Sequence, residues 1–511
     1  MKKFVLIVTI IMLAFTTCGN DPEENVNGFY GNPGTYEIVS YDGKSNVIKV
    51  NGAKTEWEVV KYSLLEYKGK EIAIIFSADV RREGAAGDLS WHVNNEGTYP
   101  TISYLPNAGA DVWHHMTGKL IVTPANDNPS IFLSTWENNT KNTVYYIANP
   151  SITIEVDSIN PALTPLQSVY KDNFLIGNII NETYMTGRHF ERLKHHYNVV
   201  TPENDMKPSL LAPSKKGGAY QWAAADAMVE KMLANGMQVQ GHVLVWHFQT
   251  PGWMIDGTKE EAEANLKNHI NTVLKHFKGK INSWDVVNEA MRDNLSPADT
   301  EGNWRNCVRS NQSDWEAPWF DKIGPEYIEL AFLAAREADP DVTLYYNDYG
   351  LDNPNKAKAV RNMIADINER YINEKGGTRK LIEGIGMQGH YNRWLNVENV
   401  RCTLELFKTL GIEIAITELD ISFSNTGVQG NRNDTVMSEN DEIEQAKLYA
   451  KLFKLFRDYS DVIVRVSMWG IDDASSWLSA GNPCLFDWRL NAKKAFYAIS
   501  DPDGFLEEYK E

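Results

Sequence analysis

The amino-acid sequence predicts an all-β sandwich followed by an α/β domain, a (β/α)8 TIM barrel. Two patterns predict this division. From about Thr35 to Val156, short β-type runs alternate with turn residues and no helical period is present, whereas the rest of the chain alternates strand-like runs with amphipathic helices. A chain of 511 residues also has room for two or three domains. We place the sandwich at residues 31–158 and the barrel at residues 159–506.

The first residues of the chain predict export. Lys2 and Lys3 precede an apolar run, residues 4–15, which is shorter than the roughly 20 residues of a membrane-spanning helix and therefore indicates a signal peptide over residues 1–18. Cys18 resembles the lipid-modified cysteine of bacterial lipoproteins, and the polar residues 19–30 would then form a flexible tether. We expect an exported lipoprotein at the outer membrane or cell surface of a Gram-negative bacterium. Ordinary secretion is the alternative, because Phe15 and Thr17 depart from the lipoprotein pattern.

The composition excludes several classes of partner and ligand. A net charge of -18 at pH 7 would repel nucleic acid and anionic membranes, so we expect no nucleic-acid partner and a membrane contact only through the lipid anchor. The remaining cysteines, Cys307, Cys402 and Cys484, allow at most one disulfide and have no metal-site spacing. The sequence contains no phosphate-binding loop or nucleotide fingerprint. We therefore expect no cofactor and no metal, and a monomeric protein.

The predicted sandwich consists of short apolar runs such as "TYEIVSY", "NVIKV", "EIAIIFSADV", "GKLIVTP" and "SIFLSTW". Turn dipeptides separate them, among them Asp42-Gly43 and Asn51-Gly52. The last runs, "SIFLSTWENN" and "VYYIANPSITIEV", resemble the closing strands of carbohydrate-binding modules. Three tryptophans are candidates for stacking on sugar rings, with burial in the core as the alternative: Trp91, Trp113 and Trp136.

The predicted barrel follows as eight strand candidates in chain order: "FLIGNII", "NVVTPEN", "QVQGHVLVWH", "INSWDVVNEA", "VTLYYNDYG", "IEGIGMQGHY", "IEIAITELD" and "VIVRVSMWGIDD". Helical segments lie between them, for example "AADAMVEKMLANG", "EANLKNHINTVLKHF" and "EIEQAKLYAKLFKLFRDY", whose apolar residues recur every three or four positions. Eight such units in about 340 residues fit a (β/α)8 barrel, which tolerates loop insertions.

Polar and aromatic side chains gather at the predicted C-terminal ends of these strands, where barrels place their active sites. The set comprises Glu203, Asn204, His242, Trp246, His247, Asn288, Glu289, Asn347, Asp348, Gln388, His390, Glu418, Asp420, Trp469 and Asp472. Glu289 by itself is also compatible with stabilisation of a helix dipole. Glu289 and Glu418, however, end the fourth and seventh strands, and paired carboxylates across a barrel mouth are what retaining glycosidases need.

Seven blocks of the barrel resemble, in order, the signature blocks of glycoside hydrolase family 10, the endo-β-1,4-xylanases. They are "TPENDMKP", "GHVLVWHFQTPGWM", "WDVVNEA", "LYYNDYG", "GIGMQGHY", "ITELDI" and "WGIDDASSWL", and the resemblance runs from about Leu163 to Ile499. It implies retaining hydrolysis of internal β-1,4 linkages, with xylan and xylo-oligosaccharides as substrates. Two alternatives remain, a barrel glycosidase acting on another β-1,4 glucan and a non-catalytic glycan-binding lipoprotein.

The resemblance also implies roles for individual residues. Glu289 would be the acid/base and Glu418 the nucleophile, while Asn288 would bind the 2-hydroxyl of the sugar. His390, paired with Asp420, would keep Glu418 ionised. The residues implied to line the substrate site are Glu203, Asn204, Lys207, His242, Trp246, Gln249 and Gln388, with Trp469 and Trp477 closing over the sugar.

Two features of the resemblance concern specificity. A ring such as Trp477, placed where glucose has its hydroxymethyl group, would exclude glucose polymers by a clash. The long segment after the fourth strand contains Trp304, Trp315 and Trp319, and we expect it to shape the leaving-group side of the cleft.

Overall fold

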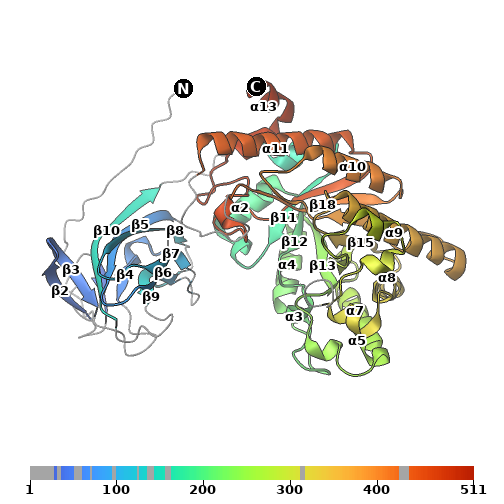
Figure 1. The fold of residues 1–511 in the computed structure, drawn as a ribbon, viewed down its shortest axis with the longest axis horizontal. Coiled ribbons are helices and arrows are strands. Elements are labelled where there is room, and N and C mark those ends of the chain that lie inside the picture. Colours follow the sequence, from blue (N-terminus) through green and yellow to red (C-terminus); the bar gives the residue numbers. More distant parts are fainter. Residues whose placement is uncertain are drawn as a thin grey trace. The chain divides into compact units, whose positions relative to one another are not determined.

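The computed structural model describes residues 28–31, 36–50, 60–69, 72–94, 99, 101–122, 126–134, 143–155, 163–310, 317–424 and 437–510. Most of the chain falls into two compact units that divide near residue 160 (Figure 1). The predictions for Cys18, the tether up to residue 27, Trp136 and Trp315 lie outside the described residues. Within the described part of the chain, no helix combines the length and apolarity required to cross a membrane.

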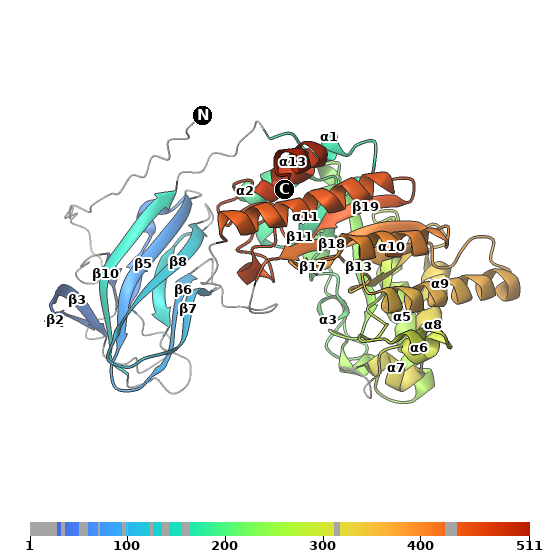
Figure 2. The ribbon, with the colours of Figure 1, turned by 45° about the horizontal axis from the view of Figure 1, so that its top comes forward.

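The N-terminal unit consists of two antiparallel sheets, as the sequence predicts (Figure 2). One sheet has the order β1 (Phe29–Tyr30), β4 (Lys61–Ser63), β9 (Ser130–Ser134), β6 (Gly87–Asn94), β7 (Thr101–Ala108). The other has the order β2 (Tyr36–Tyr41), β3 (Lys44–Val50), β10 (Tyr145–Glu155), β5 (Ile72–Arg82), β8 (Trp113–Val122). A short 3-10 turn, η1 (Leu65–Tyr67), follows β4.

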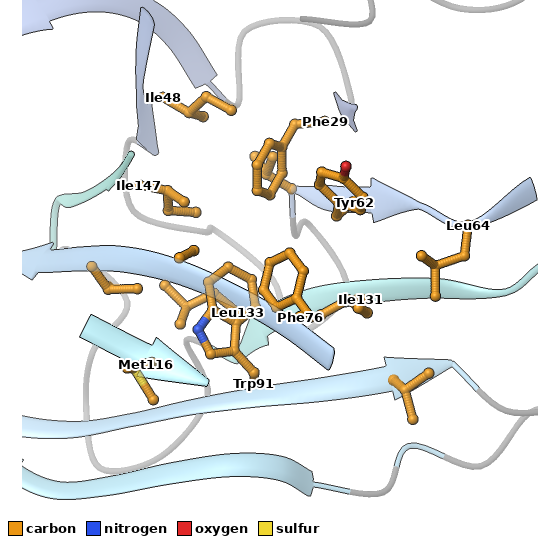
Figure 3. Close-up of a cluster of buried hydrophobic side chains, with 14 of the residues drawn as sticks. Phe29, Ile48, Tyr62, Leu64, Phe76, Trp91, Met116, Ile131, Leu133 and Ile147 are labelled. Carbon is orange, nitrogen blue, oxygen red and sulfur yellow. The ribbon is translucent and has the colours of Figure 1, made fainter. Parts of the chain in front are cut away.

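The core of this unit forms because alternate residues of each strand point inward. Buried and partly exposed positions alternate along much of β5, which fits a strand with one face on a core. Side chains from both sheets pack together there, and Figure 3 shows Phe76 and Trp91 among them. The Trp91 ring is fully buried and lies 5.0 Å from that of Phe76, so the core alternative is correct for this residue. Trp113 is partly exposed, and its indole N–H donates to Asp42 at 2.9 Å.

The second unit is a closed barrel of eight parallel strands, which confirms the predicted fold. In order around the barrel the strands are β11 (Leu175–Ile180), β12 (Val199–Pro202), β13 (Gln238–Trp246), β14 (Ser283–Asn288), β15 (Thr343–Asp348), β16 (Gly384–Met387), β18 (Glu413–Ser422) and β19 (Ile463–Met468). Pairing of β19 with β11 closes the ring. A ninth short strand, β17 (His390–Asn392), pairs with the far end of β18.

Helices surround the barrel strands (Figure 1). The longer ones are α2 (Gly187–His196), α4 (Ala223–Ala234), α5 (Lys259–Phe277), α8 (Tyr327–Ala338), α9 (Pro354–Lys375), α10 (Val397–Lys408) and α11 (Glu439–Asp458). Short helices complete the unit: α1 (Leu166–Val169), α3 (Pro208–Leu211), α6 (Pro297–Thr300), α7 (Pro318–Ile323), α12 (Lys494–Ser500), α13 (Pro502–Glu508), and the 3-10 turns η2 (Thr183–Met185), η3 (Gly252–Met254), η4 (Trp304–Cys307) and η5 (Ser479–Gly481).

Local sequence signals set where these helices begin and end. Thr258 and Glu261 form a capping box at the start of α5, which satisfies backbone N–H groups that have no partner within the helix. Asn353 caps α9, and Gly376 ends it in a left-handed conformation that a residue without a Cβ adopts at little cost. The cysteines Cys307, Cys402 and Cys484 are free thiols.

Candidate active site

The C-terminal ends of the barrel strands bring the two glutamates into one hydrogen-bonded network. Asn288 is the last residue of β14, and Glu289 follows it with a left-handed φ of 57°. Glu418 lies within the longer β18, because that strand continues past the barrel rim to pair with β17. The predicted sixth strand breaks into β16 and β17 around Gly389, whose φ of 81° turns the chain and places His390 opposite Asp420.

The carboxyl group of Glu289 accepts hydrogen bonds from neutral donors. The Trp246 indole donates to Oε2 at 2.8 Å, and the amides of Asn288 and Gln388 donate to Oε1 at 3.0 and 2.8 Å. Burial raises the pKa of Glu289 above its ordinary value, and the negative charges of Asp348 and Glu418 raise it further, against the hydrogen bonds from Gln388 and Trp246. Such a carboxyl group retains its proton to higher pH and can act as an acid.

The carboxyl group of Glu418 has a charged partner instead. His390 Nε2 lies 3.1 Å from Oε2, and the Asn347 amide donates to Oε1 at 2.8 Å. Burial alone would raise the pKa of Glu418, but the hydrogen bond from His390, the electrostatic effects of His242 and His390, and the hydrogen bond from Asn347 together lower it. At pH values between the two pKa values, Glu418 is therefore ionised while Glu289 still carries its proton.

His390 links Glu418 to Asp420. Its Nδ1 lies 3.0 Å from Asp420 Oδ1, so an imidazolium at this position donates one hydrogen bond to each carboxylate. Burial lowers the pKa of His390, but the charge of Asp420 and the hydrogen bonds to Asp420 and Glu418 outweigh it and raise the pKa to about 10. The Trp477 indole donates to the other oxygen of Asp420 at 2.9 Å, and its half-exposed ring lies 5.0 Å from that of His390.

Asn347 connects the two glutamates, although the sequence analysis noted it at the rim without assigning it a role. Its amide donates both to Glu418 Oε1 and, at 2.9 Å, to Asn288 Oδ1, while Thr417 donates to its carbonyl at 2.7 Å. Gln388 also donates to Asn288 Oδ1, at 3.2 Å. These contacts leave Asn288 with one rotamer and one amide orientation. The signal that could have identified Asn347 is its register, since it pairs with Asn288 across β14 and β15.

His242 lies within the barrel below the rim. Its Nδ1 is 2.9 Å from Asp285 Oδ2, and the Gln240 amide donates to the other oxygen of Asp285 at 2.9 Å. The carboxylate of Asp285 therefore fixes the orientation of the His242 ring through Nδ1. The ring of buried Trp469 packs edge-on against His242, with 5.8 Å between ring centroids.

A further group follows β12. Lys207 is buried, donates to Asn204 at 2.9 Å, and lies 5.1 Å from the centre of the Trp246 ring. Burial lowers the pKa of Lys207, while the charges of Glu418, Glu203 and Glu289 oppose that change. Glu203 accepts a hydrogen bond at 2.8 Å from Asn181, which was not among the residues predicted from the sequence. Gln249 is exposed in the loop after β13 with a φ of 49°, so the structure does not tie it to this network as it does the other predicted residues.

Several rim residues are buried or paired with other protein side chains, which accounts for their polar character without a sugar contact. Asp348 is fully buried and pairs with Lys356 at 3.0 Å, and Asp472 accepts from His189 at 3.0 Å. Burial lowers the pKa of His247 to about 3. In the segment after β14, two tryptophans that we considered for the cleft are buried, Trp304 at 5% and Trp319 at 3% exposure, and the Trp304 indole binds Asp366.

Comparison with known proteins identifies the family of this barrel. A model described as glycosyl hydrolase family 10 matches residues 165–502. A β-1,4-xylanase of Dictyoglomus thermophilum is 38% identical over 343 residues, covering 65% of this chain and 90% of the relative. Exoglucanase XynX of Acetivibrio thermocellus is 36% identical over 380 residues, covering 71% of this chain, which spans only 31% of that longer relative.

Solved structures agree. A bacterial Ig-like domain containing GH10 xylanase from termite gut has 33% identity and a TM-score of 0.62, covering 83% of this chain and 94% of its own. TsXylA, an intracellular xylanase from Thermoanaerobacterium saccharolyticum solved as a mutant with xylotriose, has 33% identity and a TM-score of 0.58, covering 67% of this chain and all of its own. The family that the seven sequence blocks predict is thus confirmed: the chain belongs to glycosyl hydrolase family 10.

Proposed function

We propose that this chain is a retaining endo-1,4-β-xylanase that cleaves internal β-1,4 linkages of xylan by double displacement. The observation that supports the proposal best is the opposite environment of two carboxyl groups in one network. Glu289 is bound by neutral donors and has a raised pKa, whereas Glu418 is bound by His390 and has a lowered pKa. Divergent pKa values of this kind assign one group as acid and the other as nucleophile.

In the first step, ionised Glu418 attacks the anomeric carbon while Glu289 donates its proton to the departing glycosidic oxygen. The bond from carbon to that oxygen breaks, and a covalent glycosyl-enzyme forms on Glu418. Asn288 is positioned by Asn347 and Gln388 to bind the sugar 2-hydroxyl, an interaction that strengthens in the transition state.

In the second step, Glu289 is ionised and acts as a base. It takes a proton from a water molecule, whose oxygen attacks the anomeric carbon and releases Glu418. Trp246 and Gln388 then donate to a charged carboxylate, which such donors stabilise more strongly than a neutral acid. Two inversions give retention, so the β-anomer should be the first product that NMR detects; an initial α-anomer would contradict the mechanism.

The assignment of Glu289 has a direct test. Glu289→Ala should nearly abolish cleavage of xylan, because a sugar leaving group needs a proton, yet still form the glycosyl-enzyme quickly from an activated aryl xylobioside. The intermediate should then accumulate, and added azide should release it as a β-glycosyl azide. Equal loss on both substrates would remove Glu289 from this role.

The polysaccharide itself is the second question, because one relative is named an exoglucanase. Release of reducing ends from xylan, mixed-linkage glucan and cellulose by the same preparation distinguishes the alternatives. We expect xylan to be preferred, since the Trp477 ring beside His390 would clash with the hydroxymethyl group of glucose. Trp477→Ala should then raise activity on glucan relative to xylan.

For location, we propose a lipid anchor on Cys18, from the pattern of the first residues alone. Cys18→Ala should release the protein from the membrane fraction. An unchanged distribution, with no lipid detected by mass spectrometry on the unaltered protein, would indicate ordinary secretion.

A further inference from the structure

The backbone of Glu289 needs support that its side-chain hydrogen bonds do not provide. A left-handed φ of 57° is uncommon for a residue with a Cβ and is strained unless the surroundings hold it. The Glu289 N–H donates to the Asn347 carbonyl at 2.8 Å, which continues the strand pairing by one residue. The next two amides, of Ala290 and Met291, donate to a side chain of β15.

A single buried hydroxyl accepts both of these amides. Tyr346, fully buried on β15, lies with its oxygen 3.0 Å from the Ala290 nitrogen and 3.2 Å from the Met291 nitrogen. The hydroxyl donates its own proton to Asp348 Oδ2 at 2.5 Å. One donated and two accepted hydrogen bonds use the full capacity of a tyrosine hydroxyl.

The acceptor of that proton is itself held in place. Asp348 Oδ1 accepts from Lys356 at 3.0 Å and from the Tyr349 backbone N–H at 2.9 Å. On the carbonyl side of the turn, Arg309 donates from Nη2 to the Met291 carbonyl at 3.2 Å and pairs its backbone N–H with the Ala290 carbonyl at 2.8 Å. The turn is thus fixed through its amides by Tyr346 and through its carbonyls by Arg309.

We infer that Tyr346 is a positioning residue for Glu289, acting through the backbone turn of residues 289–291. The carboxyl group of Glu289 is held by hydrogen bonds from Trp246, Asn288 and Gln388. The backbone that carries this side chain is held by the Tyr346 hydroxyl, through the amide of the next residue. This inference rests on the proposed role of Glu289 as the acid/base. It adds a residue that touches neither the sugar nor either catalytic carboxyl group.

Loss of the hydroxyl would move the turn in a definite direction. In Tyr346→Phe two buried amides lose this acceptor, and a buried N–H without a partner is destabilising. The Met291 amide already lies 3.4 Å from Asp348 Oδ2, which also loses the Tyr346 proton and becomes the nearest replacement. A shift of the Met291 amide toward Asp348 would displace the turn and with it the Glu289 side chain.

The test compares kcat/KM for two substrates, since kcat/KM reports the steps up to formation of the glycosyl-enzyme. Xylohexaose needs a proton on its leaving group, whereas 2,4-dinitrophenyl β-xylobioside does not. For Tyr346→Phe we expect kcat/KM to fall roughly 10- to 100-fold on xylohexaose, the scale of a misplacement of about 1 Å, with a change below about threefold on the aryl substrate. A loss of correctly folded protein would lower both values equally.

The neighbouring tyrosine provides a matched control. Tyr345 is also buried on β15, and its hydroxyl donates to Glu413, a residue at the opposite end of the barrel strands. Tyr345→Phe removes the same atom from the same strand and should change neither rate. The Arg309 guanidinium donates from Nε to the Glu289 carbonyl at 3.4 Å and from Nη2 to the Met291 carbonyl at 3.2 Å. Should Tyr346→Phe be insoluble, Arg309→Lys retains the charge but cannot make both bonds, and we expect a smaller difference between the substrates in the same direction.

Three outcomes decide the matter. Selective loss on xylohexaose for Tyr346→Phe, with Tyr345→Phe unchanged, supports the inference. Equal loss on both substrates, or no loss on either, overturns it. Glu289→Ala, measured alongside, separates failure of the positioning role from failure of the proposed function. If Glu289→Ala discriminates between the substrates and Tyr346→Phe does not, only the positioning role of Tyr346 fails. If Glu289→Ala does not discriminate, the proposed function fails.

Discussion

The ends of β14 and β18 present the same functional group in two different environments. At the end of β14, Glu289 accepts hydrogen bonds from an indole and two amides, all of them neutral. On β18, Glu418 accepts from one amide and from His390, whose own pKa of about 10 makes it a cation. Both carboxyl groups lie in the interior of the rim, so burial alone would raise both pKa values. For Glu418 that effect is reversed, first by the hydrogen bond from His390 and then by the charges of His242 and His390 and the hydrogen bond from Asn347.

This difference shows that the charge of the hydrogen-bond partners, rather than their number, assigns the roles. Neutral donors favour the ionised form of Glu289 too weakly to offset its burial, so the group keeps a proton that it can give up and later take back. A cation stabilises only the ionised form, which suits a group that attacks as a carboxylate.

Removal of the nucleophile should have the largest effect. Glu418→Ala should lose roughly 10⁵-fold or more in kcat on xylan and on an activated aryl xylobioside alike, because no leaving group makes a nucleophile dispensable. Product analysis with azide should give an α-glycosyl product, if any, since the anion enters from the face that Glu418 vacates. A covalent intermediate accumulating in this variant would mean that the two roles must be exchanged.

Removal of the charged partner should shift the pH profile. In His390→Asn, Glu418 loses the largest of the interactions that offset its burial, so its pKa rises and the acidic limb of kcat/KM should move to higher pH, with a loss of roughly 10²-fold at neutral pH. His189→Asn removes another partly buried histidine from an aspartate, Asp472, and is the matched control. If both variants moved the limb alike, the effect would be one of general destabilisation.

The same pair predicts how stability depends on pH. The pKa of His390 rises from 6.5 to about 10 on folding, so protonation of the folded state stabilises the protein fully below about pH 6.5 and this contribution is lost as the pH rises through 10. The melting temperature of the unaltered protein should therefore fall between pH 7 and pH 10 by more than that of His390→Asn. Parallel curves for the two proteins would show that His390 is not charged in the folded state.

Deletion of the sandwich should have the smallest effect on chemistry. Its hydrophobic core consists of residues from its own two sheets, and the two glutamates with their hydrogen-bond partners all lie in the barrel unit. Removal of residues 31–158 should therefore leave kcat/KM on xylotetraose within about twofold, while lowering binding to insoluble xylan in a pull-down assay. A truncated barrel that does not fold would give the sandwich a structural role instead.

Much of the barrel could be predicted because its signals are local. The strand runs are bounded by turns, the helices repeat apolar residues with helical period, and Thr258 with Glu261 marks a helix start. The break of the sixth strand at Gly389 could not be predicted, since a glycine inside a strand pattern does not reveal that the chain leaves one strand and pairs again as another. The burial of Trp91 was equally open, because a tryptophan on a sandwich strand faces either the core or the solvent.

The sequence by itself determined which residues meet at the rim, because parallel strands place their C-terminal ends at one end of a barrel and the order of the strands follows the chain. It also determined the two glutamates as candidates, through the blocks "WDVVNEA" and "ITELD". Only the tertiary structure decided the position of each glutamate and the direction of its pKa shift. Asn347 binds Asn288 and Glu418 across three strands, and Tyr346 accepts two amides from the turn after β14. These hydrogen bonds join residues more than fifty positions apart in the chain. They form only when the strands place both partners to within a few tenths of an ångström, and no local sequence pattern encodes that placement.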